Sequence, residues 1–381
     1  MAEAGWDEVR ARRLARSSLH ERTSGDRVVE LVSTLCGVHA QVQTSAGLQL
    51  ATRLEDLTEA DLRAELWEER TLVKAWTVRG TLHLHPAEEL PLWLAARRAA
   101  LGSTAEGLPA WRDPGGVTHP ALEAREVDAG RAAVRDALDG CCLLREELAA
   151  AVVERVGDGP RERLRSGFAF FFDDLCQGPP QGSRITLARP DQWIAGWREV
   201  TDEREALREV CRRFIHAYGP TRPTDFREWF SGARLTADVA RALFDELAGE
   251  LEEIDVGGRR RFVLAGDTAF PEPASQVRLL PEYDVYVMGF RERDQLVPDA
   301  VRELIARHGR GRYEGPAGVR LVLVDGIAAG LWERRRRGRR IELDVRLARR
   351  LAKRRRAELE HEAERFGAFL GLEPLLRIET G

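Results

Sequence analysis

The chain carries two glutamines two positions apart, in the run His-Ala-Gln-Val-Gln at residues 39–43. On an extended backbone, side chains at i and i+2 point to the same side, so we expect the amides of Gln41 and Gln43 to act together. A glutamine amide donates and accepts hydrogen bonds but does not titrate near neutral pH, so the pair cannot supply a general base. It suits a reaction whose leaving group is already activated, in which a water needs only to be placed. Taken alone, such a pair is also typical of ordinary polar surface.

A second group of residues suited to binding lies near the C-terminus. Residues 334–340 contain six arginines in seven positions: Arg334, Arg335, Arg336, Arg337, Arg339 and Arg340. Like charges this dense repel one another unless an anion neutralises them. At a hairpin tip they could reach DNA phosphates or a minor groove, whose negative potential favours Arg. The alternative is a solvated charged turn. The basic run 349–356 is open to two interpretations, DNA contact or a solvated helix face paired with Glu358 and Glu360.

Several other kinds of chemistry lack their residues. His83 and His85 would share a strand face but have no third ligand, so we expect no zinc site. No Gly-rich loop precedes a Lys-Ser/Thr pair, and no C-x-x-C spacing occurs among the five cysteines. We therefore expect no metal and no cofactor. The glutamine motif itself contains no lysine, and Lys74 is the only one near it in the sequence, so a Schiff-base step is not expected.

Composition limits the class of protein. The 381 residues are 43% hydrophobic and 32% charged, with a net charge of -4, so the chain is not globally basic. Residues 320–360 nevertheless hold 14 Lys and Arg against 6 Asp and Glu, a local excess that can attract phosphates. No apolar run approaches the ~18 residues needed to span a membrane, and no signal segment is visible at the start. We expect a cytoplasmic, nucleoid-associated protein.

The pattern of residues along the chain predicts an α+β fold, in which tandem winged-helix units are followed by a β subdomain. In residues 1–120 a helix at 60–69 precedes strands at 72–78 and 81–85, which is the winged-helix order. Residues 107–120 look like a linker loop. Residues 121–200 repeat the pattern, with helices expected at 127–138, 144–156 and 161–176, the last ended by Gly178-Pro179-Pro180, and a wing strand at 184–188.

The third unit, residues 201–270, has the clearest signals. Helices are expected at 205–218, from a cap at Thr224 to Phe230, and from a cap at Thr236 to about Leu247. Strands 251–256 and 260–264 flank Gly257-Gly258, which is a strong hairpin signal. In residues 271–381 strands are expected at 277–288, 320–331 and 339–345, with the arginine-rich turn between the last two and a closing helix at 347–369.

Three further stretches accompany the glutamine pair in a fixed order along the chain. They are residues 76–84, with Arg79-Gly80-Thr81-Leu82-His83-Leu84; residues 280–284, Leu-Pro-Glu-Tyr-Asp, followed by Arg291-Glu292-Arg293; and Val324-Asp325-Gly326, followed by Gly330-Leu331-Trp332. With the Gln-hydrophobic-Gln run, they resemble the AlkZ-like winged-helix DNA glycosylases over nearly the whole chain. The YcaQ-like relatives have Asp where this chain has Gln43, which places it nearer the branch linked to resistance against DNA-alkylating natural products.

The resemblance implies a monofunctional glycosylase that acts as a monomer on double-stranded DNA carrying alkylated purines and leaves an abasic site. It implies that Gln41 and Gln43 hold the attacking water and tolerate the developing sugar cation. The arginine-rich turn and Arg79 are then the expected DNA contacts. Tyr283 and Asp284 have either a structural capping role or a functional one, and Trp76 is either core or a stacking platform. The rival functions are a winged-helix transcription regulator without catalysis and a housekeeping glycosylase for small alkylated bases.

Overall fold

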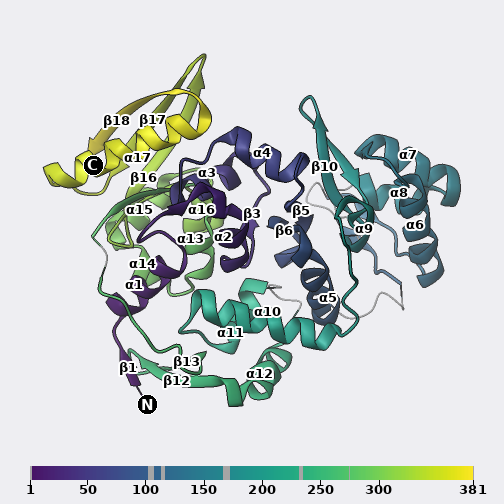
Figure 1. The fold of residues 1–381 in the computed structure, drawn as a ribbon, viewed down its shortest axis with the longest axis horizontal. Coiled ribbons are helices and arrows are strands. Elements are labelled where there is room, and N and C mark those ends of the chain that lie inside the picture. The colour runs from purple at the N-terminus through teal and green to yellow at the C-terminus, as the bar shows by residue number, and fades with distance from the viewer. Residues whose placement is uncertain are drawn as a thin grey trace. The chain divides into compact units, whose positions relative to one another are not determined.

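The computed structural model describes residues 2–101, 107–112, 116–165, 172–230, 235–273 and 275–380, and confirms an α+β fold (Figure 1). The chain divides into two compact units, residues 1–63 with 211–381, and residues 64–210. The four-part division at 120, 200 and 270, and the tandem winged-helix arrangement, stay predictions. No helix within the described ranges is long and apolar enough to cross a membrane.

The larger unit contains a five-stranded sheet in the order β14-β15-β16-β17-β18. Its strands are β14 (Val277–Leu280), β15 (Leu321–Val324), β16 (Ile327–Arg337), β17 (Arg340–Leu347) and β18 (Glu373–Thr380). Only β17 and β18 are parallel, and helix α17 (Lys353–Leu370) makes the crossover that a parallel pair requires. Trp332 of β16 packs on Phe366 of α17, with ring centroids 5.4 Å apart.

Three expectations for this region are corrected. The single strand expected at 320–331 is two antiparallel strands, β15 and β16, with a turn at Asp325-Gly326. The strand expected at 277–288 ends at Leu280, because Asp284 caps a short helix, α13 (Val285–Gly289). The closing helix begins at Lys353 rather than 347, because Leu347 is still paired in β17. An apolar cluster that includes Leu280, Leu321 and Leu331 packs the sheet against α15 (Asp299–Arg307). Two short helices complete this layer, α14 (Arg293–Leu296) and α16 (Gly311–Glu314).

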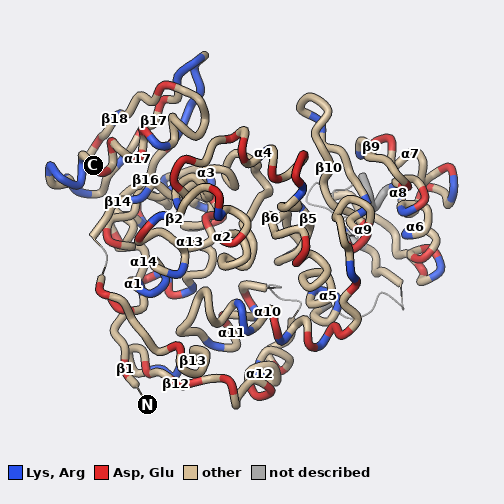
Figure 2. The backbone as a smooth tube through the Cα atoms, in the orientation of Figure 1, with Lys and Arg blue, Asp and Glu red and all other residues tan. Residues whose placement is uncertain are grey.

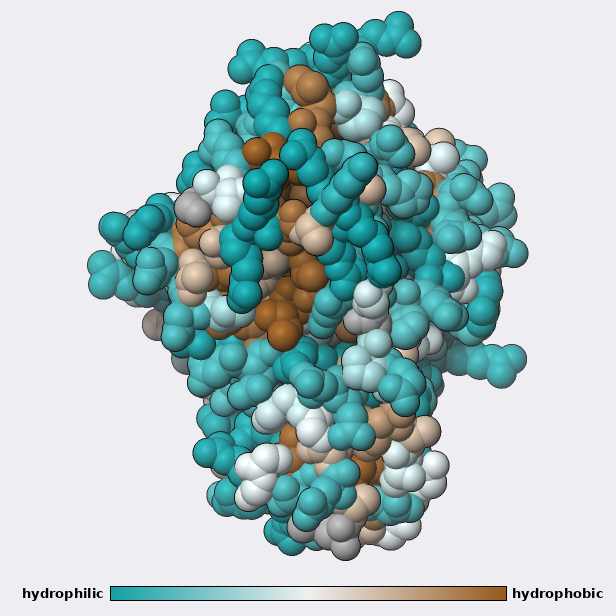
Figure 3. Space-filling view, turned by 90° about the vertical axis from the view of Figure 1, so that its left-hand side faces the viewer, coloured by the Kyte–Doolittle hydropathy of each residue, from teal (hydrophilic) through white to brown (hydrophobic). Residues whose placement is uncertain are grey.

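Hydrophilic side chains cover most of the face seen in Figure 3, and a band of hydrophobic side chains lies between them. Strand β18 is an edge of the sheet, and its Leu375 is 40% exposed.

The N-terminal part of the larger unit is mainly helical. It contains β1 (Ala2–Ala4), α1 (Trp6–Arg16), β2 (Thr23–Ser24), α2 (Val28–Thr34), β3 (Val38–His39), α3 (Gln43–Arg53), β4 (Leu54–Glu55) and α4 (Glu59–Trp67), which crosses the unit boundary. Strand β1 runs parallel to β12 (Leu251–Val256), which pairs in turn with β13 (Arg260–Leu264). The hairpin predicted around Gly257-Gly258 is confirmed with both of its strands.

Three helices precede that hairpin: α10 (Glu203–Tyr218), which also crosses the unit boundary, α11 (Pro223–Phe230) and α12 (Ala237–Glu246). Thr236 caps α12 by accepting a hydrogen bond from Val239 N at 3.2 Å, as expected. Thr224 does not cap α11, because that helix already begins at Pro223. Proline is favoured at the first helical position, where its missing N–H costs nothing.

The smaller unit has a sheet in which strands run in the order β6-β5-β10-β11-β9. They are β5 (Leu72–Trp76), β6 (Leu82–Pro86), β9 (Leu143–Leu144), β10 (Cys176–Gln181) and β11 (Arg184–Ala188). Its helices are α5 (Leu90–Leu101), α6 (Ala124–Ala137), α7 (Arg145–Val156), α8 (Asp158–Arg165) and α9 (Pro190–Trp193). Strands β7 (Trp111–Arg112) and β8 (Thr118–His119) pair antiparallel within the expected linker.

The helix expected at 161–176 is wrong at its C-terminal end. Cys176 begins β10, and Gly178-Pro179-Pro180 lies within that strand instead of ending a helix. The strand tolerates these prolines because its register with β11 shifts between Gly178 and Gln181, where a ladder hydrogen bond is not required. Residues 166–171, which carry most of the phenylalanine run, lie outside the described residues.

Candidate active site

The two glutamines lie at the start of helix α3. Strand β3 ends at His39, Gln41 and Val42 form a bend, and Gln43 is the first helical residue. The one residue between the two glutamines, Val42, is extended, with φ -110° and ψ 109°. The joint action of the two amides stays a prediction. Both glutamine side chains are exposed. A helix N-terminus directs its backbone N–H groups outward and favours negative charge, so this position suits a phosphate or the oxygen of a polarised water.

Behind these exposed residues, α3 is buried and is hydrogen-bonded to residues 279–285 along its length. Ser45 Oγ donates to the carbonyl of Glu282 at 2.5 Å, and Thr52 Oγ1 donates to that of Leu279 at 3.1 Å. Gln49 Oε1 accepts from Val285 N at 3.2 Å. The polar residues of α3 at i, i+4 and i+7 thus form one face. This spacing is visible in the sequence and could have shown that the helix has a buried polar face.

A buried ion pair completes the attachment. Arg53 Nη1 and Nη2 donate to the two carboxylate oxygens of Asp284 at 2.8 and 2.7 Å, and both side chains are fully buried. Asp284 also accepts from Tyr286 N at 2.9 Å and so caps α13. Of the two interpretations of Asp284, the structure therefore supports the structural cap.

The same turn is connected to the base of the arginine-rich hairpin. Arg320 contacts Glu282 at 2.7 Å and Glu333 of β16 at 2.6 Å, and Glu333 also contacts His308 Nε2 at 2.8 Å. Next along β16, burial lowers the pKa of Arg334, and the nearby Arg320 lowers it further. Arg334 is thus half-buried at the hairpin base and differs from its exposed neighbours.

The remaining five arginines form the tip. Arg337 pairs with Arg340 across the turn at Gly338-Arg339, and Gly338 has φ 61°, which glycine adopts without strain. Figure 2 shows basic residues gathered at this tip. Arg337 contacts Glu342 at 3.3 Å and Arg340 contacts Glu373 at 2.9 Å. Such exposed pairs stabilise little, so a phosphate could replace the carboxylates. DNA binding by the tip stays a prediction.

The other basic cluster, in the first turns of α17, matches its alternative interpretation. Arg354 and Arg355 each contact Glu358 at 2.9 Å, and Arg356 contacts Glu360 at 3.2 Å. These pairs, spaced three or four residues apart, are those of a charge-paired surface helix.

In the smaller unit, Arg79 lies in a tight turn and has φ 56°. Its role as a DNA contact stays a prediction. Trp76 is 5% exposed and belongs to an apolar cluster, which supports the core interpretation. His85 Nε2 and Thr77 Oγ1 share a hydrogen bond of 2.8 Å, and the His85 ring lies 4.5 Å from that of Trp93.

His83 and His85 are both buried, and His83 Nδ1 lies 2.9 Å from the carbonyl of Thr81. Across the described residues, no group of three or more His, Cys, Asp or Glu side chains could hold a metal ion.

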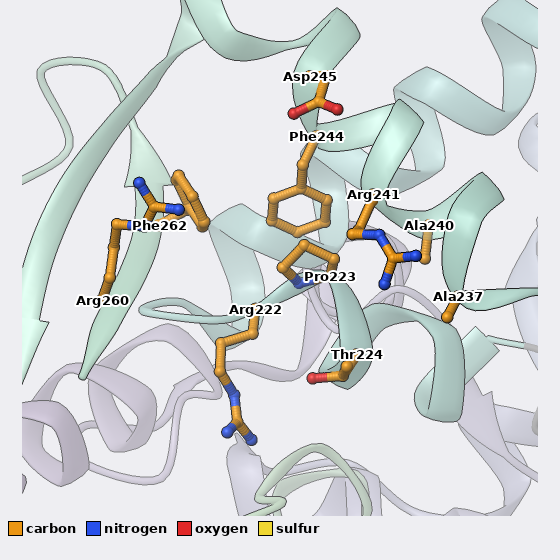
Figure 4. Close-up of a pocket in the computed structure, with 10 residues that line it drawn as sticks. All are labelled: Arg222, Pro223, Thr224, Ala237, Ala240, Arg241, Phe244, Asp245, Arg260 and Phe262. Carbon is orange, nitrogen blue, oxygen red and sulfur yellow. The ribbon is translucent and has the colours of Figure 1, made fainter.

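A separate pocket of about 430 Å³ lies among α11, α12 and β13 (Figure 4). Phe244, Phe262 and Pro223 give it apolar walls, and three arginines stand around it: Arg222, Arg241 and Arg260. Arg222 is bound to Asp225 at 2.7 Å and to Glu292 at 3.3 Å. Neither glutamine of the candidate site lines this pocket, so we assign it no part in the reaction.

Three comparisons with known proteins identify relatives of this chain. The model of the family "DNA glycosylase AlkZ-like" matches residues 32–369. An interstrand DNA cross-link repair glycosylase of Streptomyces sahachiroi is 33% identical over 344 residues, which cover 87% of this chain and 88% of the relative. The solved structure of the S. sahachiroi DNA glycosylase AlkZ superimposes with a TM-score of 0.78 at 30% identity and covers 99% of this chain and 100% of that chain. On this evidence the chain belongs to the AlkZ-like family of DNA glycosylases.

Proposed function

We propose that this glycosylase hydrolyses the N-glycosidic bond of bulky N7-alkylated purines in double-stranded DNA, unhooks interstrand cross-links, and protects its host against a genotoxic natural product. We also propose that it acts as a monomer. The family membership and a relative named as an interstrand cross-link repair glycosylase support this proposal. The observation that carries it is the exposure of Gln41 and Gln43 at the N-terminus of a buried, firmly attached helix.

The proposed chemistry follows from the charge of the lesion. Alkylation at N7 makes the purine cationic, so the base can leave without being protonated, and the sugar passes through an oxocarbenium-like state. A water must then be held close to C1′. Amide oxygens of Gln41 and Gln43 can accept hydrogen bonds from that water and direct its lone pair, while the positive end of the α3 dipole favours its growing hydroxide character.

The absence of a carboxylate from this pair limits the substrate. Asn and Gln amides cannot take a proton near neutral pH, so the site gives no strong general base. Already labile cationic adducts should therefore be cleaved, and neutral lesions should be poor substrates. Neither glutamine is accompanied by lysine, and we propose that the enzyme releases the base without a Schiff-base step and leaves an abasic site.

The proposed DNA contacts are phosphate contacts. The exposed tip arginines carry most of the charge, with Arg79 of the smaller unit as a second contact. Glu333, at the base of the hairpin, is connected through Arg320 and Glu282 to the turn that holds α3, so DNA bound by the hairpin would be bound by an element joined to the helix of the glutamines.

Single-turnover excision measures the role of the glutamines. Gln41→Ala and Gln43→Ala should each lower the excision of an N7-alkylguanine adduct from duplex DNA by about a hundredfold or more, the cost of misplacing a reacting group. Gln181→Ala, an exposed glutamine on β10, is the matched control and should keep the wild-type rate. Wild-type rates in both motif variants would overturn the assignment. A cross-linked duplex tests unhooking, and preference for small methylated bases would favour the housekeeping alternative.

A further inference from the structure

Tyr283 adopts a backbone conformation that bulky residues avoid. Its φ is 59°, in the left-handed region, where Gly and Asn are common and aromatic residues are rare. Six other non-glycine residues of the described chain have positive φ, and none of them is aromatic. A residue retained in a strained conformation calls for a reason in its surroundings, and such residues cluster at functional sites.

The surroundings of Tyr283 lie on one side of the glutamine pair. Its ring centroid is 4.8 Å from that of His39, with an angle of 41° between the planes. His39 ends β3, two residues before Gln41, and is 6% exposed. The Tyr283 hydroxyl donates to the Glu314 carboxylate. Burial, and to a smaller extent this hydrogen bond, raises the pKa of Tyr283 to about 12.

The residue before Tyr283 lies on the other side of the pair. Glu282 accepts the 2.5 Å hydrogen bond from Ser45 Oγ, and Ser45 follows Gln43 by two residues. One strained turn therefore contacts the chain just before Gln41 and just after Gln43. The backbone of that turn is fixed in addition by a hydrogen bond of 2.7 Å from Tyr283 N to Ala317 O.

We propose that Tyr283 is a positioning residue for the glutamine pair. Its left-handed backbone turns the ring onto His39 and so fixes the segment 39–43, whose exposed glutamines must place a water within a fraction of an ångström of its reacting position. The turn gives up stability for this placement. The inference rests on the proposed function of Gln41 and Gln43.

Tyr283→Asn separates positioning from packing. Asn tolerates the left-handed region and removes the ring, so the variant should keep or raise the melting temperature. Its single-turnover rate at saturating enzyme should fall about tenfold to a hundredfold, as expected for a misplaced reacting group, while DNA affinity stays within about twofold. Tyr283→Phe keeps the contact with His39 and removes only the bond to Glu314, so it should retain at least about a third of the rate.

Tyr286→Phe is the matched control in the same segment. Tyr286 is buried, and its hydroxyl donates to Gly326 O at 3.1 Å. This hydrogen bond does not involve the glutamine segment. This variant should lose stability and keep its rate.

The proposal is overturned by a Tyr283→Asn protein that cleaves at the wild-type rate, or by one that does not fold, since its ring would then be needed for packing. Equal losses of rate in Tyr283→Phe and Tyr283→Asn would also overturn it. Gln41→Ala and Gln43→Ala, measured in parallel, distinguish the two failures. If these are inactive while Tyr283→Asn is fully active, only the positioning role fails; if these are fully active, the proposed function fails.

Discussion

At the scale of single residues, the Arg53–Asp284 pair joins the glutamine helix to the turn before α13. Each partner has given up its hydration, since both side chains are fully buried, and each depends on the other for compensation. Arg53 and Asp284 are 231 positions apart in the sequence, so the pair joins two distant segments of the chain within the larger unit.

Replacing Asp284 by Ala should lower the free energy of unfolding by about 3–5 kcal/mol, because a buried guanidinium is left without its partner. Urea unfolding gives this difference. Asp344→Ala removes a partly exposed pair with Arg377, whose atoms are 3.3 Å apart, and should cost less than about 1 kcal/mol. Equal losses in the two variants would contradict the account of the buried pair.

Lys74 of β5 is 5% exposed, and burial lowers its pKa from 10.5 to about 8. Between these two pKa values the unfolded chain holds more protons at this residue than the folded chain, so folding stability should rise as pH increases from about 8 to 10.5. Below pH 8 the full penalty for the buried charge applies.

Lys74→Met should therefore be more stable than the wild type at pH 7, by up to roughly 3 kcal/mol from the size of the shift, and should lack this rise with pH. Unfolding curves collected at pH 7, 9 and 10 compare the two proteins. A rise of equal size in Lys74→Met would show that another group is responsible.

At the scale of elements, α3 and α17 approach each other closely at one glycine. A Cβ added at Gly47 would lie 2.6 Å from Cζ of Phe369, a distance that real contacts do not show. The glycine thus allows the ring to pack on the helix of the glutamines.

Gly47→Ala should destabilise the protein by about 1–3 kcal/mol, since overpacking outweighs the better helix propensity of alanine. Gly249→Ala, where nothing lies within 4 Å, is the control and should be neutral within about 0.5 kcal/mol. Phe369→Leu should restore part of the stability in the double variant. Thermal unfolding compares these three variants with the wild type. A Gly47→Ala protein as stable as the wild type would contradict the close approach of α3 and Phe369.

We expect the arginine-rich hairpin to contribute to DNA binding more than to the rate of excision. Replacing Arg335, Arg336 and Arg337 by Ala should weaken duplex binding and flatten the dependence of log affinity on log salt by about 0.9 for each phosphate that the tip no longer neutralises. The maximal excision rate should fall less than the affinity. Arg354 and Arg356, already paired with Glu358 and Glu360, supply the control pair of substitutions and should change the slope little. A triple variant with wild-type affinity and slope would identify the tip as solvated surface.

At the scale of the molecule, a net charge of -4 coexists with a basic hairpin tip. Charges farther apart than about 10 Å are largely screened at moderate salt, so the proposed attraction of DNA phosphates by the tip would act locally.

Features that depend on neighbouring residues could be predicted from the amino-acid sequence alone. The hairpin at Gly257-Gly258 and the cap at Thr236 were predicted correctly, since turn and cap geometry are set within a few residues. Membership of the glycosylase family followed from motifs in order along the chain. The joint action of Gln41 and Gln43 stays a prediction, and the structure adds that a helix begins at Gln43.

The contacts between the motifs could not be predicted and are visible only in the folded protein. Asp284 contacts Arg53, and Glu282 contacts both Ser45 and Arg320. The ring of Tyr283 contacts that of His39, which lies more than two hundred residues away in the sequence. No local propensity encodes such contacts, because each depends on where α3, β14 and α13 pack. The physical reason is burial: a carboxylate or guanidinium removed from water must find its partner, and only the packed fold brings that partner within hydrogen-bonding distance.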